Sequence, residues 1–302
     1  MISALCRSMP ATACPALSSR ARVAAPIPEA DPEIAYRPTA PSIDCLGARR
    51  VSIAVRTQWG MPLAKDVYLG AIEREGQLLA KAGERSLGAV VPACPGWTVQ
   101  SVLVHLGRVY RSVTEHVVAR STEMIPFAKT PSPDGFDVVS WYREGLDSML
   151  EALRGIDPNE PVWSFSDNKT AGFYFRRMAH ETAMHRFDAE AATGTPAPFD
   201  GDMAADGIAE LYESVLPAGL VRRKVTLPSG SLHLHRTDGD GEWMIKAVDG
   251  TIVLTHEHGK GDAAVRGSAS DLFVFAWHRG LPHTLQFFGD EAVARARAAL
   301  AP

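Results

Sequence analysis

The residues with the clearest chemistry lie in the string from His180 to His185, which reads His-Glu-Thr-Ala-Met-His. Residues four apart share one face of an α-helix, so a helix here would place the carboxylate of Glu181 beside the imidazole of His185. The two histidines are five apart and diverge by roughly 140° around a helix, so the string is one residue too long for the zinc-protease pattern His-Glu-x-x-His. Glu181 and His185 are therefore candidate metal ligands that need a third donor.

An ordinary surface pair is the alternative for Glu181 and His185, because a glutamate followed four residues later by a histidine is common on solvated helices. At about 100° per residue, the helix has one apolar stripe. A second stripe mixes apolar and ionisable side chains, namely Tyr174, Met178, Glu181, His185 and Asp188. Ionisable groups on a half-apolar stripe are costly to bury unless something pairs them, and a divalent metal would do so.

Composition and charge indicate a soluble globular chain. The 302 residues are 46% hydrophobic and 22% charged, which is ordinary for such a protein. A formal net charge of −4, without a run of lysine or arginine, argues against nucleic acid and against a membrane surface as partners. No apolar stretch approaches the roughly 20 residues that span a bilayer. We expect a small-molecule partner and a cytoplasmic location.

The four cysteines are consistent with a reducing compartment. They are Cys6, Cys14, Cys45 and Cys94. Their spacing forms neither a metal-binding pattern nor a convincing disulfide framework. Three of them lie in residues 1–60, which are rich in Ala, Pro, Ser and Arg and lack a sustained period. This composition predicts a disordered or non-native extension, and one explanation is that translation starts at or near Met61.

The rest of the chain divides into a helical part, residues 61–219, and a mixed part, residues 220–302. Apolar periodicity predicts helices over residues 66–82, 99–118, 136–153, 171–192 and 204–216. Four long helices joined by loops are typical of a bundle, whose interior is where facing helices build metal sites.

After residue 220 the apolar period changes to two. It predicts strands over residues 232–235, 243–248, 251–255 and 263–266, followed by helices over 269–277 and 291–300. His233 with His235, and His256 with His258, are alternating pairs whose members would share one strand face, a spacing that metal sites use. A solvent-facing row of polar side chains explains the same spacing without a metal.

Helices in the first part of the chain and mainly strands in the second predict the fold class α+β.

A third donor for the helical pair is His105. Thr98 is suited to cap the second long helix, and His105, seven residues later, lies roughly 120° from the centre of the apolar stripe, at the edge of the bundle seam. A lone histidine at such a position is usually a boundary residue, so geometry alone leaves its role open.

Taken together, these motifs resemble those of the mycothiol-dependent maleylpyruvate isomerase family, a branch of the DinB-like metal-binding bundles. The similar stretches are Cys94 to Gly107, Glu181-x-x-x-His185 and Arg186 to Glu190. A looser similarity to the sterol-carrier-like C-terminal domain of that family is carried by Leu232 to His235, Glu242-Trp243, Arg266 to Leu272 and Phe288 to Asp290. The resemblance covers about residues 63–300 and implies a DinB-like four-helix bundle followed by a small α+β sterol-carrier-like domain.

The resemblance also implies a metal centre. His105, Glu181 and His185 would be the ligands of a divalent metal, with Zn²⁺ expected because two imidazoles and a carboxylate leave a fourth position open. That position would take the thiol of mycothiol as thiolate. In the isomerase, the thiolate would add to a conjugated cis double bond, allow rotation about the resulting single bond, and leave again.

Three further residues have expected roles around this centre. Arg279 is the candidate catalytic cation for a carboxylated substrate, with an exposed arginine as the alternative. Asp188 would orient His185, with an exposed carboxylate as the alternative. Cys94 is expected to pack, since an external thiol removes the need for a protein nucleophile.

Two other functions fit the same residues. The activated thiolate would serve equally in an S-transferase that acts on an electrophile, because substrate choice depends on pocket shape. A non-catalytic metal-binding protein also remains open, because a set of ligands does not prove turnover.

Overall fold

The computed structural model describes residues 63–126 and 137–302. The predicted extension over residues 1–60 and the predicted start of the third helix at Phe136 lie outside the described residues. Within them, no helix has both the length and the apolar character that crossing a membrane requires.

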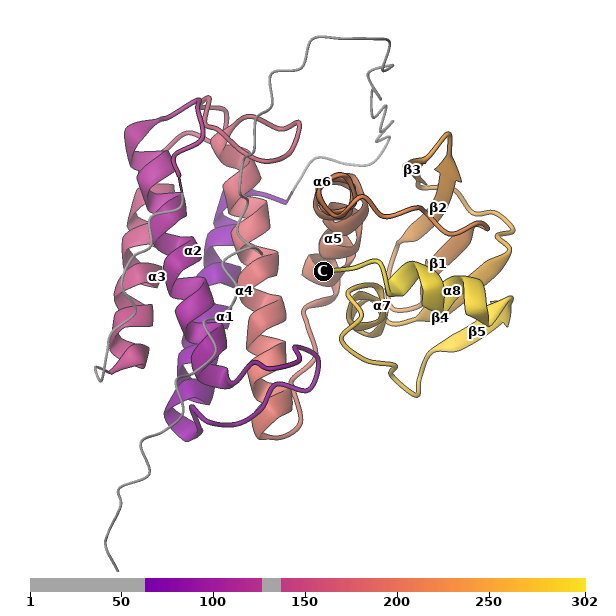
Figure 1. Cartoon of the computed structure of the whole chain (residues 1–302), viewed down its shortest axis with the longest axis horizontal. Helices are drawn as coiled ribbons and strands as arrows, with labels where there is room; N and C mark the ends of the chain where they lie inside the picture. Colours follow the sequence, from indigo (N-terminus) through magenta and orange to yellow (C-terminus); the bar gives the residue numbers. More distant parts are fainter. Residues whose placement is uncertain (1–62, 127–136) are drawn as a thin grey trace, which may run out of the picture.

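Four long helices form the first part of the molecule (Figure 1). They are α1 (Lys65–Arg85), α2 (Val99–Ala119), α3 (Val138–Arg154) and α4 (Ala171–Thr193). Each lies within three residues of a predicted helix at both ends. The Thr98 side chain accepts a hydrogen bond from the Ser101 backbone N–H, so the predicted N-cap of α2 is confirmed.

Helix α4 is buried on nearly every side. It packs against α1 and α2 within the bundle and against α5 (Gly201–Glu210) of the second part. Phe173 and Tyr174 belong to the hydrophobic core of the bundle, whereas Ala183 and Met184 belong to a second core. Both stripes predicted for this helix are therefore covered, including the one that carries ionisable side chains.

The second part contains a five-stranded sheet in the order β3-β2-β1-β4-β5. The strands are β1 (Leu232–Arg236), β2 (Glu242–Val248), β3 (Thr251–Thr255), β4 (Ala263–Gly267) and β5 (Gln286–Gly289). β1 is parallel to β4, and the other neighbouring pairs are antiparallel. The four predicted strands are confirmed. The sequence did not indicate β5, whose residues are mostly exposed and lack a buried alternation.

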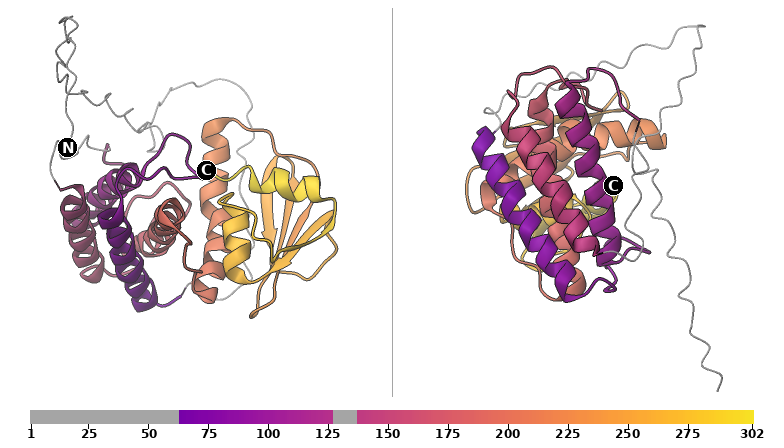
Figure 2. Two further views of the ribbon diagram at one scale, coloured as in Figure 1. Left: turned by 90° about the horizontal axis from the view of Figure 1, so that it is seen from below. Right: turned by 90° about the vertical axis from the view of Figure 1, so that its left-hand side faces the viewer.

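Helices separate the sheet from the bundle (Figures 1 and 2). Helix α5 continues through a π-turn, η2 (Leu211–Val215), into α6 (Leu216–Arg223). The predicted end at Leu216 is therefore wrong. Pro217 did not stop the helix because it lies in the first turn after the π-turn, where a missing backbone N–H costs little.

The second core lies between one face of the sheet and the helices α5, α7 (Ala269–Ala276) and α8 (Glu291–Ala298). Leu232 and Leu234 of β1 contribute to it, as does Phe273 of α7. The division of the chain at residue 219 stays a prediction. Helices α5 and α6 pack in the same hydrophobic core as the sheet, although they begin before residue 219 in the sequence.

Candidate metal centre

The side chains of His105, Glu181 and His185 converge between α2 and α4. The Nε2 atom of His105 lies 3.1 Å from Oε1 of Glu181, and the same oxygen lies 3.5 Å from Nε2 of His185. One ligand atom from each of the three residues lies within 4.8 Å of the other two. The structure thus brings together the three residues expected to bind a metal, although binding itself stays a prediction.

The separations between these atoms fit a bound divalent metal. Ligands at about 2.0–2.1 Å from a tetrahedral zinc ion lie about 3.3 Å from one another. The 3.1 Å and 3.5 Å separations lie on either side of that value. Two imidazole nitrogens and one carboxylate oxygen are also a donor set that zinc uses.

Asp188 holds His185 in the orientation that metal binding requires. Its Oδ2 lies 3.0 Å from Nδ1 of His185. Because an ionised carboxylate only accepts hydrogen bonds, Nδ1 donates its proton to Asp188, so Nε2, which faces Glu181, is the nitrogen that would bind a metal on losing its own proton. Asp188 is 1% exposed, which excludes the exposed-carboxylate alternative. Burial would raise the pKa of Asp188, but the hydrogen bond from His185 and the charge of Arg279 lower it.

Arg177 binds the second carboxylate oxygen of Glu181, Oε2. Its Nη2 donates to Oε2 of Glu181 at 2.5 Å, and its Nη1 donates to Oε2 of Glu210 at 2.6 Å. Burial would raise the pKa of Glu181, but the charge of Arg177 and hydrogen bonds from both histidines hold it well below its ordinary value. Arg177 was not among the site residues predicted from the sequence, although its spacing of four residues to Glu181 was a signal that could have found it.

Trp97 covers the two histidines. Its ring lies nearly parallel to that of His185, with 6.0 Å between centroids and 14° between planes. It is 5.2 Å from the ring of His105 at a tilt of 58°. Trp97 belongs to the loop before α2, so the cap at Thr98 positions this aromatic wall together with the helix that carries His105.

Arg279 reaches this centre through Asp188. Its Nε donates to Oδ1 of Asp188 at 3.0 Å, and its Nη1 donates to the carbonyl oxygens of Trp277 and Pro302. The side chain is 9% exposed, so the exposed-arginine alternative is excluded. Among the described residues, none accepts a hydrogen bond from Nη2. The catalytic role of Arg279 stays a prediction.

Cys94 lies beside the same network without the properties of a nucleophile. Its Sγ is 3.7 Å from Oδ2 of Asp188, and it packs against the core of the bundle. Burial, followed by the negative charge of Asp188, raises the pKa of its thiol to about 12. A thiol with this pKa is protonated at neutral pH, in agreement with the expected packing role.

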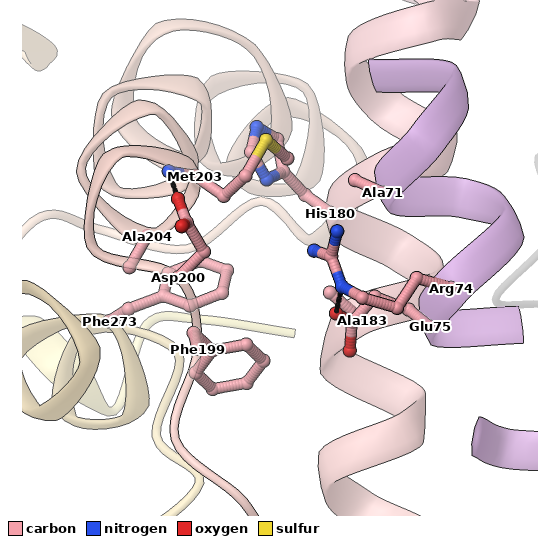
Figure 3. Close-up of a pocket in the computed structure, with 10 residues that line it drawn as sticks. All are labelled: Ala71, Arg74, Glu75, His180, Ala183, Phe199, Asp200, Met203, Ala204 and Phe273. Carbon is pink, nitrogen blue, oxygen red and sulfur yellow. Dashed lines mark hydrogen bonds and ion pairs between the residues drawn. The ribbon is translucent and has the colours of Figure 1, made fainter. Parts of the chain in front are cut away.

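His180 faces a different part of the molecule. It lines a small pocket between α1, α4 and the start of α5, together with Glu75 and Phe273 (Figure 3). Its Nε2 lies 2.8 Å from Oδ2 of Asp206. The divergence expected between His180 and His185 is therefore confirmed, and the pocket of Figure 3 does not include any residue of the metal triad.

Comparisons with known proteins bear on the family and the fold of this chain. Residues 69–190 match the family model for the mycothiol maleylpyruvate isomerase N-terminal domain. Two solved structures are similar in fold, one of the mycothiol-dependent maleylpyruvate isomerase at 13% identity and one of a histidine-to-alanine mutant of that enzyme at 12%. Both give a TM-score of 0.55 and cover 74% of this chain and 93% of their own. No curated protein sequence matches. The predicted resemblance of this chain to the mycothiol-dependent maleylpyruvate isomerase family is therefore confirmed, with residues 69–190 as the part that the family model matches.

Proposed function

We propose that the chain is a mycothiol-dependent metalloenzyme of the isomerase type, whose metal is held by His105, Glu181 and His185. The main support is the convergence of the two Nε2 atoms on one oxygen of Glu181, at 3.1 Å and 3.5 Å. Two comparisons also support it: residues 69–190 match the family model, and the fold is shared with a mycothiol-dependent maleylpyruvate isomerase.

A divalent metal at this position would favour the thiolate form of a coordinated low-molecular-weight thiol, and so supply a nucleophile at neutral pH. Zn²⁺ is the metal that the donor set fits, because three protein ligands leave one position open for the sulfur of mycothiol. The reaction class is cis–trans isomerisation of a conjugated unsaturated acid, with maleylpyruvate as the first substrate to test.

The surrounding residues hold the ligands in place before any substrate binds. Asp188 holds a proton of His185 on Nδ1, so Nε2 is the nitrogen that would ligate, in exchange for its own proton. Arg177 binds one carboxylate oxygen of Glu181 and leaves the other facing the imidazoles. Trp97 covers the histidine rings and reduces access of water to them.

Arg279 is the residue proposed to bind the carboxylate of the substrate. Its Nε and Nη1 are used in hydrogen bonds that fix the guanidinium beside Asp188. The remaining nitrogen, Nη2, would donate to the substrate anion in a charge-assisted hydrogen bond. The side chain is held from both sides, so the cation is preorganised and substrate binding would cost little side-chain entropy.

The experiment that tests this function compares the metal content of the purified full chain with that of His105→Ala and His185→Ala, by elemental mass spectrometry. Each variant is expected to contain one metal ion fewer than the wild type, and His283→Ala, an exposed histidine far from the triad in the sequence, is the matched control. Mycothiol is then titrated into Co²⁺-substituted protein, where sulfur coordination adds charge-transfer absorption.

Isomerisation of maleylpyruvate is followed in the same samples by ultraviolet absorbance. Activity that needs both the metal and mycothiol supports the full proposal. Coordination of mycothiol without isomerisation, but with conjugation to an electrophile, would favour the S-transferase. Variants that keep the full metal content of the wild type would overturn the proposed ligands.

A further inference from the structure

We propose that the sheet carries a second metal site, formed by His233 and His235 of β1, Glu242 of β2 and His258 from the connection between β3 and β4. One ligand atom from each of the four residues lies within 4.8 Å of the others. None of these residues belongs to the bundle centre, so this site stands independently of the proposed function.

Backbone pairing places three of the four ligands. Leu232 and Leu234 of β1 point into the second core and are 0% exposed. Side chains alternate along a strand, so His233 and His235 share the opposite face. Strand β2 pairs antiparallel with β1, and its Glu242 lies directly opposite His235 in the register. Cross-strand neighbours on one face have Cβ atoms about 4.5–5.5 Å apart, which is close enough for both side chains to reach one ion.

The topology of the sheet brings in the fourth ligand. β3 is antiparallel to β2, and β2 is antiparallel to β1, so β3 runs in the same direction as β1 and its parallel partner β4. The chain must therefore cross the sheet between β3 and β4 (Figure 1). It crosses the face that carries the histidines, because Gly259 lies close to the side chain of Met244, which is paired with His233. His258, next to Gly259, thereby reaches the cluster.

Glu242 is the common contact of the three imidazoles. Its Oε2 contacts Nε2 of His233. Its Oε1 lies 2.6 Å from Nδ1 of His235 and 3.1 Å from Nδ1 of His258. In the described part of the chain, no lysine or arginine forms an ion pair with Glu242, and Arg266, which shares the face beside His235, is exposed. The carboxylate is thus surrounded by groups that can all ligate a divalent ion.

The ligand set differs in kind from that of the bundle. Three nitrogens and one oxygen complete a tetrahedral coordination shell without an open position, which is the pattern of structural zinc sites. The bundle group offers only three ligands, which leaves a fourth position open. A metal on the sheet would fasten the crossing segment to the β1–β2 hairpin. The side chain of His233 is 6% exposed and that of His258 is 78% exposed. A metal ion would therefore enter from the solvent side, at His258, and bind next to the buried His233.

Zinc binding by the full chain tests this site in a background that lacks the bundle ligands, His105→Ala/His185→Ala. After removal of metal with a chelator and reloading with Zn²⁺, elemental mass spectrometry is expected to find about one zinc per chain, the count for a single closed site. Adding His258→Ala or Glu242→Gln is expected to abolish that zinc. His258→Ala removes a mostly exposed side chain, and His283→Ala, another exposed histidine, is the matched control that keeps the zinc.

Three further measurements check this result, and the first of them does not use the bundle variants. The wild type is expected to bind one zinc more than the single variant His258→Ala, and Zn²⁺ is expected to raise the thermal unfolding temperature of the double variant but not of the same chain with His258→Ala. Co²⁺ is expected to give the intense visible absorption of a tetrahedral site. A folded double variant that stays free of metal in excess Zn²⁺, or zinc that persists after His258→Ala, overturns the second site and leaves a carboxylate hydrogen-bonded by three imidazoles.

Discussion

Arg279 and Asp188 form a buried ion pair, with 3.0 Å between Nε and Oδ1, although they are 91 residues apart in the chain. Asp188 lies on α4 and its other oxygen binds His185. Arg279 follows α7 and also binds the carbonyl oxygen of Pro302. One carboxylate therefore connects a proposed metal ligand of the bundle to the C-terminal part.

Asp188→Asn is expected to weaken zinc binding at the bundle centre by about 10- to 100-fold, the usual effect of losing a partner that orients a ligand. The amide carries no charge to hold the proton of His185 on Nδ1. The zinc affinity would be measured by competition with a chromophoric chelator in the His258→Ala background, so that only one site is read. Asp202→Asn, at a carboxylate that is 76% exposed, is the control. An unchanged affinity in Asp188→Asn would show that His185 needs no such partner.

Arg279→Met is expected to raise KM for a carboxylated substrate by about 10- to 100-fold, which corresponds to the loss of one charge-assisted hydrogen bond. Zinc affinity should change less than in Asp188→Asn, because Arg279 acts on the proposed ligand His185 only through Asp188. Steady-state kinetics on the free acid and on its methyl ester separates the two roles of Arg279. If the ester loses as much kcat/KM as the acid does, Arg279 acts on the position of Asp188 instead of on the substrate.

Cys94→Ser is expected to keep the thiol-dependent activity of the wild type. The thiol of Cys94 is protonated at neutral pH because burial and the neighbouring Asp188 raise its pKa to about 12, and only a thiolate attacks efficiently. Alkylation by iodoacetamide at pH 7.5, mapped by mass spectrometry of the peptide that contains Cys94, should be slow in the folded chain and fast after unfolding. Rapid labelling of the folded chain, or loss of activity in the serine variant, would assign the chemistry to Cys94.

Asp206→Asn is expected to destabilise the folded chain by about 3–5 kcal/mol, the cost of removing one partner from a buried ion pair. Asp206 pairs with Arg176 and His180, and accepts a hydrogen bond from Tyr68. Burial would raise the pKa of Asp206, but the hydrogen bond from His180 and the charge of Arg176 hold it well below its ordinary value.

The pH dependence of stability follows from the direction of that shift. Because the folded-state pKa is depressed, the stabilisation by Asp206 is complete above the unfolded-state value of about 4 and is lost as the pH falls from there toward the folded-state pKa. Urea unfolding at pH 7, 5 and 3 should therefore show a smaller acid-induced loss in Asp206→Asn than in the wild type. Equal losses would mean that Asp206 is not ionised more readily in the folded state than in the unfolded state.

Local features of the sequence predicted most of the elements. The four long helices were predicted from apolar periodicity and from the cap at Thr98, because both signals depend on residues within one or two turns. The strands of the sheet that alternate between a buried and an outer face were predicted as well. The edge strand β5 was not, because most of its residues are exposed and it has no alternation to detect. The helix that continues past Pro217 was missed because a π-turn changes the register of the chain.

The sequence by itself determined the pair Glu181 and His185, because a spacing of four residues on a helix fixes their proximity without help from the rest of the chain. His105 was identified by resemblance, since periodicity placed it only at a boundary. Tertiary packing decided which distant charges meet: Arg177 with Glu210, Arg279 with Asp188, and the histidines of the sheet around one glutamate. Periodicity specifies which face of an element is buried, but the long-range contacts that bring buried faces together depend on the arrangement of whole helices and strands.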